Sequence, residues 1–184
     1  MSEGSEGGYG VDAAVAVSLI RMVAADRAAA APWQRPSQAR LVELGLDALM
    51  AGVEAPSLPW LAGLGRNEYW QAPELFDLVV EELGLLPSDS ADLAAARWTA
   101  ARWWAGQVVT RRLDPVRGAG LIWLEAAAEL DYPDALRPLV DLATAIEPAD
   151  DEPPPPSRQQ VQEADIIAAA RDFLSTEARP EHGV

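Results

Sequence analysis

The sequence predicts an all-α protein, and three observations lead to that fold class. Apolar residues recur at spacings of three and four, as in Val11, Val15, Leu19 and Met22. Helix-starting and helix-ending residues separate these segments at intervals typical of helices. No run of β-branched residues alternates with polar ones between turn signals, so no strand is predicted. We expect a compact irregular bundle of about 7–8 helices with no sheet.

The chain of 184 residues is long enough for one domain with a sizeable core. Residues 1–10 are rich in glycine, serine and acids, which predicts a flexible tail. Residues 11–146 are predicted to form the helical domain. An acidic proline-rich linker is expected over 147–157, because its four consecutive prolines favour an extended segment. A C-terminal helix over 158–178, docked on the domain, and a tail over 179–184 complete the expectation.

Three helical segments are expected at the start of the domain. The first runs over 12–31 and is closed by Pro32. The second follows the N-cap residue Ser37 and ends before Gly52. Residues 57–72 predict a short helical turn followed by a loop.

Two longer helices are expected next. Pro73 suits the first position of a helix, where its missing N–H is not needed, and Gly84 suits the position just after the end. Asp89 or Ser90 is then expected to cap a helix that extends to about Arg112.

Residue types that are typical of helix caps also predict where the last helices begin. Asp114 followed by Pro115 predicts a helix to about Asp131, and further prolines divide the helix that ends near Ile146. The final helix is expected to begin with a capping box at Ser157.

Three tryptophans lie close together in the helix expected to reach Arg112. At about 100° per residue, Trp98 and Trp104 fall on or beside the apolar side of that helix. Trp103 falls on the polar side, beside Gln107. Two interpretations remain open for Trp103: it packs against a neighbouring element, or it is an exposed anchor for a partner.

The helix that starts at Pro115 contains two glycines, Gly118 and Gly120. Each glycine lowers helix stability by about 1 kcal/mol relative to alanine. We therefore expect them to allow the close approach of a neighbouring backbone.

The charge of the chain excludes one class of partner. The formal net charge is −15, and all 14 basic residues are arginine. Because nucleic-acid affinity depends on neutralising phosphates, we expect no nucleic-acid binding. No stretch of about 18 uninterrupted apolar residues is present, so no membrane span is expected. There is no cysteine and no signal-like N-terminus, so we expect a cytoplasmic protein.

The residue types that catalysis requires are scarce or poorly placed, so we expect a protein that is not an enzyme. The only histidine, His182, lies near the C-terminus, so a histidine-based triad or metal site is not expected. Glu74, Asp77 and Glu81 share one helix face, which is typical of a solvated surface and less often of a Mg²⁺ site. We expect no catalytic residue, no metal and no cofactor.

The stretch LDPVRGA, at residues 113–119, leads into an aromatic and acidic helix and is followed by EADIIAAARDFL. Residues 98–174 resemble small uncharacterised helical proteins that are common in actinomycetes. The resemblance implies one compact helical unit of bacterial origin, and the proline-rich linker departs from it. It implies no activity, so no functional residue is carried over.

These observations favour a non-catalytic module that binds a protein partner, for example an immunity-type or accessory protein that occupies a basic site. This hypothesis is supported by the acidic charge and by a set of candidate partner-binding residues. They are Trp103, Gln107, Glu74, Asp77 and Glu81. A first alternative is a small-molecule sensor or enzyme whose pocket is lined by aromatic residues. Its candidate walls are Trp60, Tyr69, Trp70, Trp103 and Trp123. A second alternative is a homo-oligomeric structural unit, because the oligomeric state is open.

Overall fold

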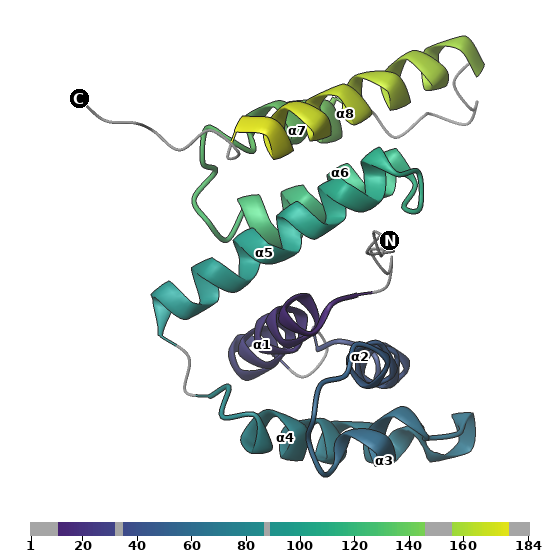
Figure 1. Cartoon of the computed structure of the whole chain (residues 1–184), viewed down its shortest axis with the longest axis vertical. Helices are drawn as coiled ribbons and strands as arrows, with labels where there is room; N and C mark the ends of the chain where they lie inside the picture. The colour runs from purple at the N-terminus through teal and green to yellow at the C-terminus, as the bar shows by residue number, and fades with distance from the viewer. Residues whose placement is uncertain (1–10, 32–34, 87–88, 146–155, 177–184) are drawn as a thin grey trace, which may run out of the picture. The chain divides into compact units, whose positions relative to one another are not determined.

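A computed structural model describes residues 11–31, 35–86, 89–145 and 156–176. Its regular elements are all helices, and these ranges contain no strand (Figure 1). In chain order they are α1 (Ala13–Ala29), α2 (Gln38–Met50), α3 (Leu58–Ala62), the 3₁₀-helix η2 (Arg66–Gln71), α4 (Ala72–Glu82), α5 (Ser90–Val109), α6 (Pro115–Leu121), the π-helix η3 (Ile122–Ala127), α7 (Arg137–Thr144) and α8 (Pro156–Thr176). The predicted all-α class is confirmed.

Some predictions concern residues outside these ranges. The predicted tails over 1–10 and 179–184, most of the linker over 147–157, and His182 are among them. The final helix begins at Pro156, so Ser157 lies within it and does not precede it.

The predicted N-caps Ser37 and Asp114 are confirmed by hydrogen bonds. Asp12, predicted as the first residue of its helix, is also an N-cap, because its carboxylate accepts from the backbone N–H of Val15 at 2.8 Å. Ser37 Oγ accepts from the N–H of Arg40 at 3.3 Å. The Asp114 carboxylate accepts from an N–H in the first turn of α6 at 2.9 Å. Each side chain satisfies a donor that has no partner within its helix, which is why these helices begin where the sequence indicates.

The loop predicted at the end of 57–72 is wrong, because residues 66–71 form the 3₁₀-helix η2. The turn is closed by Glu68, whose carboxylate accepts from the backbone N–H of Gly65 at 3.0 Å. Glu68 also donates its own N–H to the Gly65 carbonyl at 2.8 Å. The helix then continues into α4, because Ala72 has right-handed helical dihedral angles.

Two predicted helix ends also differ from the structure. The helix expected to reach Arg112 ends at Val109, and Arg111 takes a positive φ of 55°. The helix expected to reach Asp131 changes to π geometry at Ile122 and ends at Ala127. Arg111 lies two residues after Val109, and Asp131 and Tyr132, which also have positive φ, lie four and five residues after Ala127.

The chain divides into two compact units, Met1–Ala96 and Arg97–Val184. The boundary falls inside α5 and inside the single domain predicted over 11–146. That prediction of one domain stays a prediction.

In the first unit, α2 packs against α1, α3, α4 and η2 (Figure 1). The core contains large apolar side chains from all four α-helices. Those that are almost fully buried are Ile20, Leu41, Leu44, Leu58, Leu61, Phe76 and Val79. These residues recur at helical spacings, so each helix buries one apolar stripe.

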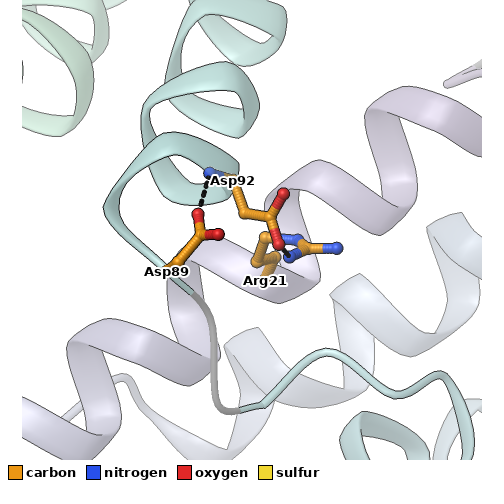
Figure 2. A network of polar contacts seen from close by, with 3 residues as sticks. All are labelled: Arg21, Asp89 and Asp92. Atoms are coloured by element: carbon orange, nitrogen blue, oxygen red, sulfur yellow. Dashed lines mark hydrogen bonds and ion pairs between the residues drawn. The ribbon is translucent and has the colours of Figure 1, made fainter.

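The first turn of α5 is attached to α1 of the same unit. The Arg21 guanidinium forms an ion pair with the Asp92 carboxylate at 2.9 Å (Figure 2). The Asp89 carboxylate accepts from the backbone N–H of Asp92 at 2.7 Å and acts as the predicted cap. The cap and the ion pair thus hold the start of α5.

In the second unit, α8 packs against α6 and α7. Its stripe of Ile166, Ile167, Ala170 and Phe173 is buried. Phe173 stacks on Trp98, with ring centroids 6.2 Å apart and an interplanar angle of 26°. The C-terminal helix therefore lies on the core of this unit.

A buried arginine stabilises the π-helix of the second unit. The Arg97 guanidinium donates to the backbone carbonyl of Glu125 at 2.5 Å and lies 3.5 Å from the Glu129 carboxylate. In η3, the N–H of Ala128 bonds to the carbonyl of Trp123, five residues earlier. The altered pairing directs the Glu125 carbonyl to a side chain, and Arg97 satisfies it.

The two glycines of α6 differ in their surroundings. A Cβ at Gly118 would lie 2.2 Å from Val108 Cγ2, so the absence of a side chain is required there. A Cβ at Gly120 would have no atom within 4 Å. The predicted close approach of a neighbouring backbone is therefore wrong at both positions, because the nearest atoms at Gly118 belong to side chains and Gly120 has none near it.

Candidate functional site

The predicted acidic face of α4 is exposed to solvent. Glu74, Asp77 and Glu81 lie within about 60° of one another around the helix and are all exposed. The opposite side of α4 contributes Phe76 and Val79, both fully buried, to the core. Because the buried side fixes the rotation of α4, the acidic side must face outward.

Three of the carboxylates on η2 and α4 have partners within the unit. Glu68 closes η2, as described above. Glu82 accepts from the Ser57 backbone N–H at 2.9 Å and from its hydroxyl at 2.6 Å. Asp77 forms an ion pair with an arginine of α1. For Glu74 and Glu81, by contrast, the described part of the chain provides no hydrogen bond or ion pair.

The arginine bound to Asp77 is Arg27, whose side chain is only 11% exposed. One of its nitrogens lies 3.0 and 3.2 Å from the two carboxylate oxygens of Asp77. The guanidinium also lies 5.6 Å from the centroid of the Phe76 ring. Arg27 therefore neutralises Asp77 and holds α4 against α1.

Two exposed apolar side chains lie near the acids. Leu78 is 41% exposed and follows Glu74 by one turn on the same side of α4, and Trp70 is 69% exposed on the 3₁₀-helix η2 that leads into α4. We call the set Trp70, Glu74, Leu78 and Glu81 the α4 outer face. Neither Trp70 nor Leu78 was among the predicted partner-binding residues. Leu78 follows Glu74 by four residues in the predicted helix, whereas Trp70 fell in the predicted loop.

The predicted residues Trp103 and Gln107 lie in the second unit, on α5. Both are half-buried. The indole N–H of Trp103 is buried, and the described residues offer it no acceptor. Because its one polar atom is buried, Trp103 fits the packed interpretation better than that of an exposed anchor. Partner binding by these two residues stays a prediction.

The residues expected to line an aromatic pocket are also divided between the units. Trp60 and Trp70, in the first unit, are 73% and 69% exposed, which is unlike the wall of a pocket. Tyr69 in that unit is half-buried, as are Trp103 and Trp123 in the other. This distribution gives the small-molecule alternative no support.

Neither a cluster of metal-binding side chains nor a membrane-spanning helix occurs in the described ranges. They contain no group of three or more His, Asp or Glu residues placed to hold a metal ion. No helix in them has the length and apolar character required to cross a bilayer.

One carboxyl group of the first unit has a shifted pKa. Burial raises the pKa of Asp47 on α2 above its ordinary value. Arg40 opposes the shift and Glu43 adds to it. Asp47 lies on a different helix from the α4 outer face.

No protein-family model, curated protein or solved structure matches this chain. The resemblance of residues 98–174 to actinomycete proteins therefore stays a prediction.

Proposed function

We propose that this protein is a non-catalytic binding module whose α4 outer face holds a basic segment of a partner protein. One observation carries the proposal: Glu74 and Glu81, exposed and without a partner among the described residues, flank the exposed Leu78. Trp70, also exposed, lies on η2, which leads into α4. The proposal keeps Glu74 and Glu81 from the sequence prediction and adds two apolar residues.

The apolar side chains are expected to supply most of the affinity. Burial of apolar surface contributes about 25 cal/mol per Å², and tryptophan is enriched among residues that dominate binding energy. Exposed ion pairs contribute only about 0–1 kcal/mol each. The carboxylates are therefore expected to select a basic partner, and the apolar residues to hold it.

The overall charge favours such a partner. The net charge of −15 attracts cationic surfaces over long distances and raises their association rate at low ionic strength. Asp77 is expected to take little part, because Arg27 already neutralises it.

The proposal is tested by titrating the full chain into labelled peptides of arginine and leucine, and into matched peptides of glutamate and leucine. We expect binding of the cationic peptide only. The double variant Glu74→Gln/Glu81→Gln should weaken it about tenfold, which corresponds to about 1.4 kcal/mol.

The matched control is Glu43→Gln/Glu54→Gln, which removes the same charge from exposed positions of the first unit. It should change the affinity less than about twofold, since only screened long-range charge is lost. Equal weakening by both double variants, or no binding of the cationic peptide, would contradict the proposal.

A further inference from the structure

The spacing of the α4 outer face indicates the conformation of what it binds. Glu74 and Glu81 are seven residues apart, so they are separated by about 10.5 Å along the helix and by only about 20° around it. Leu78 lies between them on the same side.

This spacing is held rigidly. At the middle of α4, Asp77 is fixed to α1 through Arg27. At its end, Glu82 is fixed to Ser57 by two hydrogen bonds. Because Phe76 and Val79 are fully buried on the other side, the helix cannot rotate without opening the core. A ligand must therefore match the positions of the two carboxylates as they stand.

We propose that the bound segment is an amphipathic α-helix that lies along α4 and presents two cationic residues seven positions apart with an apolar residue between them. This inference rests on the proposed function and specifies its partner. In a helix, residues i, i+3 or i+4, and i+7 share one side and have the same rise as Glu74, Leu78 and Glu81. A partner helix can therefore make all three contacts at once.

An extended strand does not match this face. Its side chains alternate between two sides, so residues on one side are about 6.6 or 13 Å apart along the strand. Neither distance equals the separation of about 10.5 Å between Glu74 and Glu81. A strand residue three positions away has the right rise but points to the opposite side.

Trp70 extends the expected pattern by one further contact. It precedes Leu78 by eight residues, two of them in the 3₁₀-helix η2, which corresponds to a rise of about 13 Å. The partner helix is therefore expected to carry a second apolar residue beyond the cation that meets Glu74. Its contact side then has cationic residues at positions i and i+7 and apolar residues at i+3 and i+11, or the same pattern in reverse order.

The experiment measures the binding of three labelled peptides to the full chain by fluorescence anisotropy, and the first two have identical composition. The register peptide carries its two arginines and two leucines at the spacing above in an alanine background. In the shifted peptide the same residues are placed on different sides of the helix. A third peptide is the register peptide with a proline on its non-contacting side, which prevents the helix. We expect the register peptide to bind about tenfold more tightly than either of the others.

Two variants test whether the preference for the register peptide depends on the α4 outer face. Leu78→Ala and Glu81→Gln should each abolish most of the preference for the register peptide, whereas Glu54→Gln should retain it. Circular dichroism of the register peptide should show helix gained on binding. If the register, shifted and proline peptides bind within about twofold of one another, the helical partner is wrong while the basic partner stands. If no cationic peptide binds, the proposed function fails as well.

Discussion

The tryptophans of the two units have opposite environments. In the first unit, Trp60 and Trp70 are 73% and 69% exposed. In the second, Trp104 is 4% exposed, and Trp98, Trp103 and Trp123 are half-buried. Among the described tryptophans, the three that are clustered in the sequence and Trp123 are thus mostly packing residues, whereas Trp60 and Trp70 reach solvent.

The difference follows from the helices that carry them. The long helix α5 packs as part of a core, and Trp98 stacks on Phe173 of α8. The short helix α3 packs against α2 with Leu58 and Leu61 buried, which leaves Trp60 on its outer side, and η2 has no buried residue, so Trp70 is exposed. Exposed aromatic residues without an internal role are the stronger indication of a binding surface.

The largest effect on stability is expected when a buried tryptophan is replaced by alanine, and the same replacement of an exposed tryptophan serves as the comparison. Trp104→Ala leaves a cavity in the core of the second unit and should lower the free energy of unfolding by about 3–5 kcal/mol. Trp60→Ala should change it by less than about 0.5 kcal/mol, because the ring is exposed. Urea unfolding followed by far-ultraviolet circular dichroism gives both values. Equal losses would show that the two environments do not differ.

A second comparison concerns two arginines of the second unit. Arg97→Ala removes the donor to the Glu125 carbonyl and should lower the free energy of unfolding by about 2 kcal/mol. Arg137→Ala breaks an exposed pair with Asp134 and should cost less than about 0.5 kcal/mol. The same denaturation measurement applies. A small effect of Arg97→Ala would mean that the π-helix does not depend on this arginine.

The two glycines of α6 should respond with opposite signs. Gly118→Ala places a methyl group against Val108, a loss of about 1–3 kcal/mol that exceeds the gain in helix propensity of about 1 kcal/mol. Gly120→Ala meets no atom and should stabilise the helix by up to about 1 kcal/mol. Thermal unfolding of both variants is sufficient. Stabilisation by Gly118→Ala would show that the close approach is not as described.

The smallest effect is a pH dependence in the first unit. Because burial raises the pKa of Asp47 in the folded state above its ordinary value of 3.8, the folded state binds the proton more tightly. Asp47 therefore favours folding at low pH, and this contribution is lost as the pH rises above 3.8 through the folded pKa. Asp47→Asn should raise the Tm at neutral pH relative to the wild type. Below about pH 4 the difference should shrink. A difference that does not change with pH would contradict the assigned shift.

Much of the fold could be predicted from local sequence rules. Asp12, Ser37 and Asp114 define helix starts through hydrogen bonds that span three residues, so the sequence contains the whole signal. The π-helix was not predictable in this way. One of its carbonyls, that of Glu125, accepts a hydrogen bond from Arg97, which lies 28 residues earlier in the sequence.

The candidate site was predicted only in part, because some of its contacts also join residues that are far apart in the sequence. The periodicity of Glu74, Asp77 and Glu81 placed them on one side of a helix, and that side is exposed. Sequence alone could not show that Arg27 neutralises Asp77, because the pair joins helices 50 residues apart. Nor could it show that Leu78 is exposed, since that depends on which side of α4 meets the core.

The most direct test of this account is acrylamide quenching of tryptophan fluorescence in the full chain and in Trp70→Phe and Trp103→Phe. We predict that Trp70→Phe removes a strongly quenched component, whereas Trp103→Phe leaves the quenched fraction almost unchanged. The opposite result, with Trp103 the more accessible indole, would contradict the assignment of the binding surface to α4. It would place the exposed anchor on α5 instead.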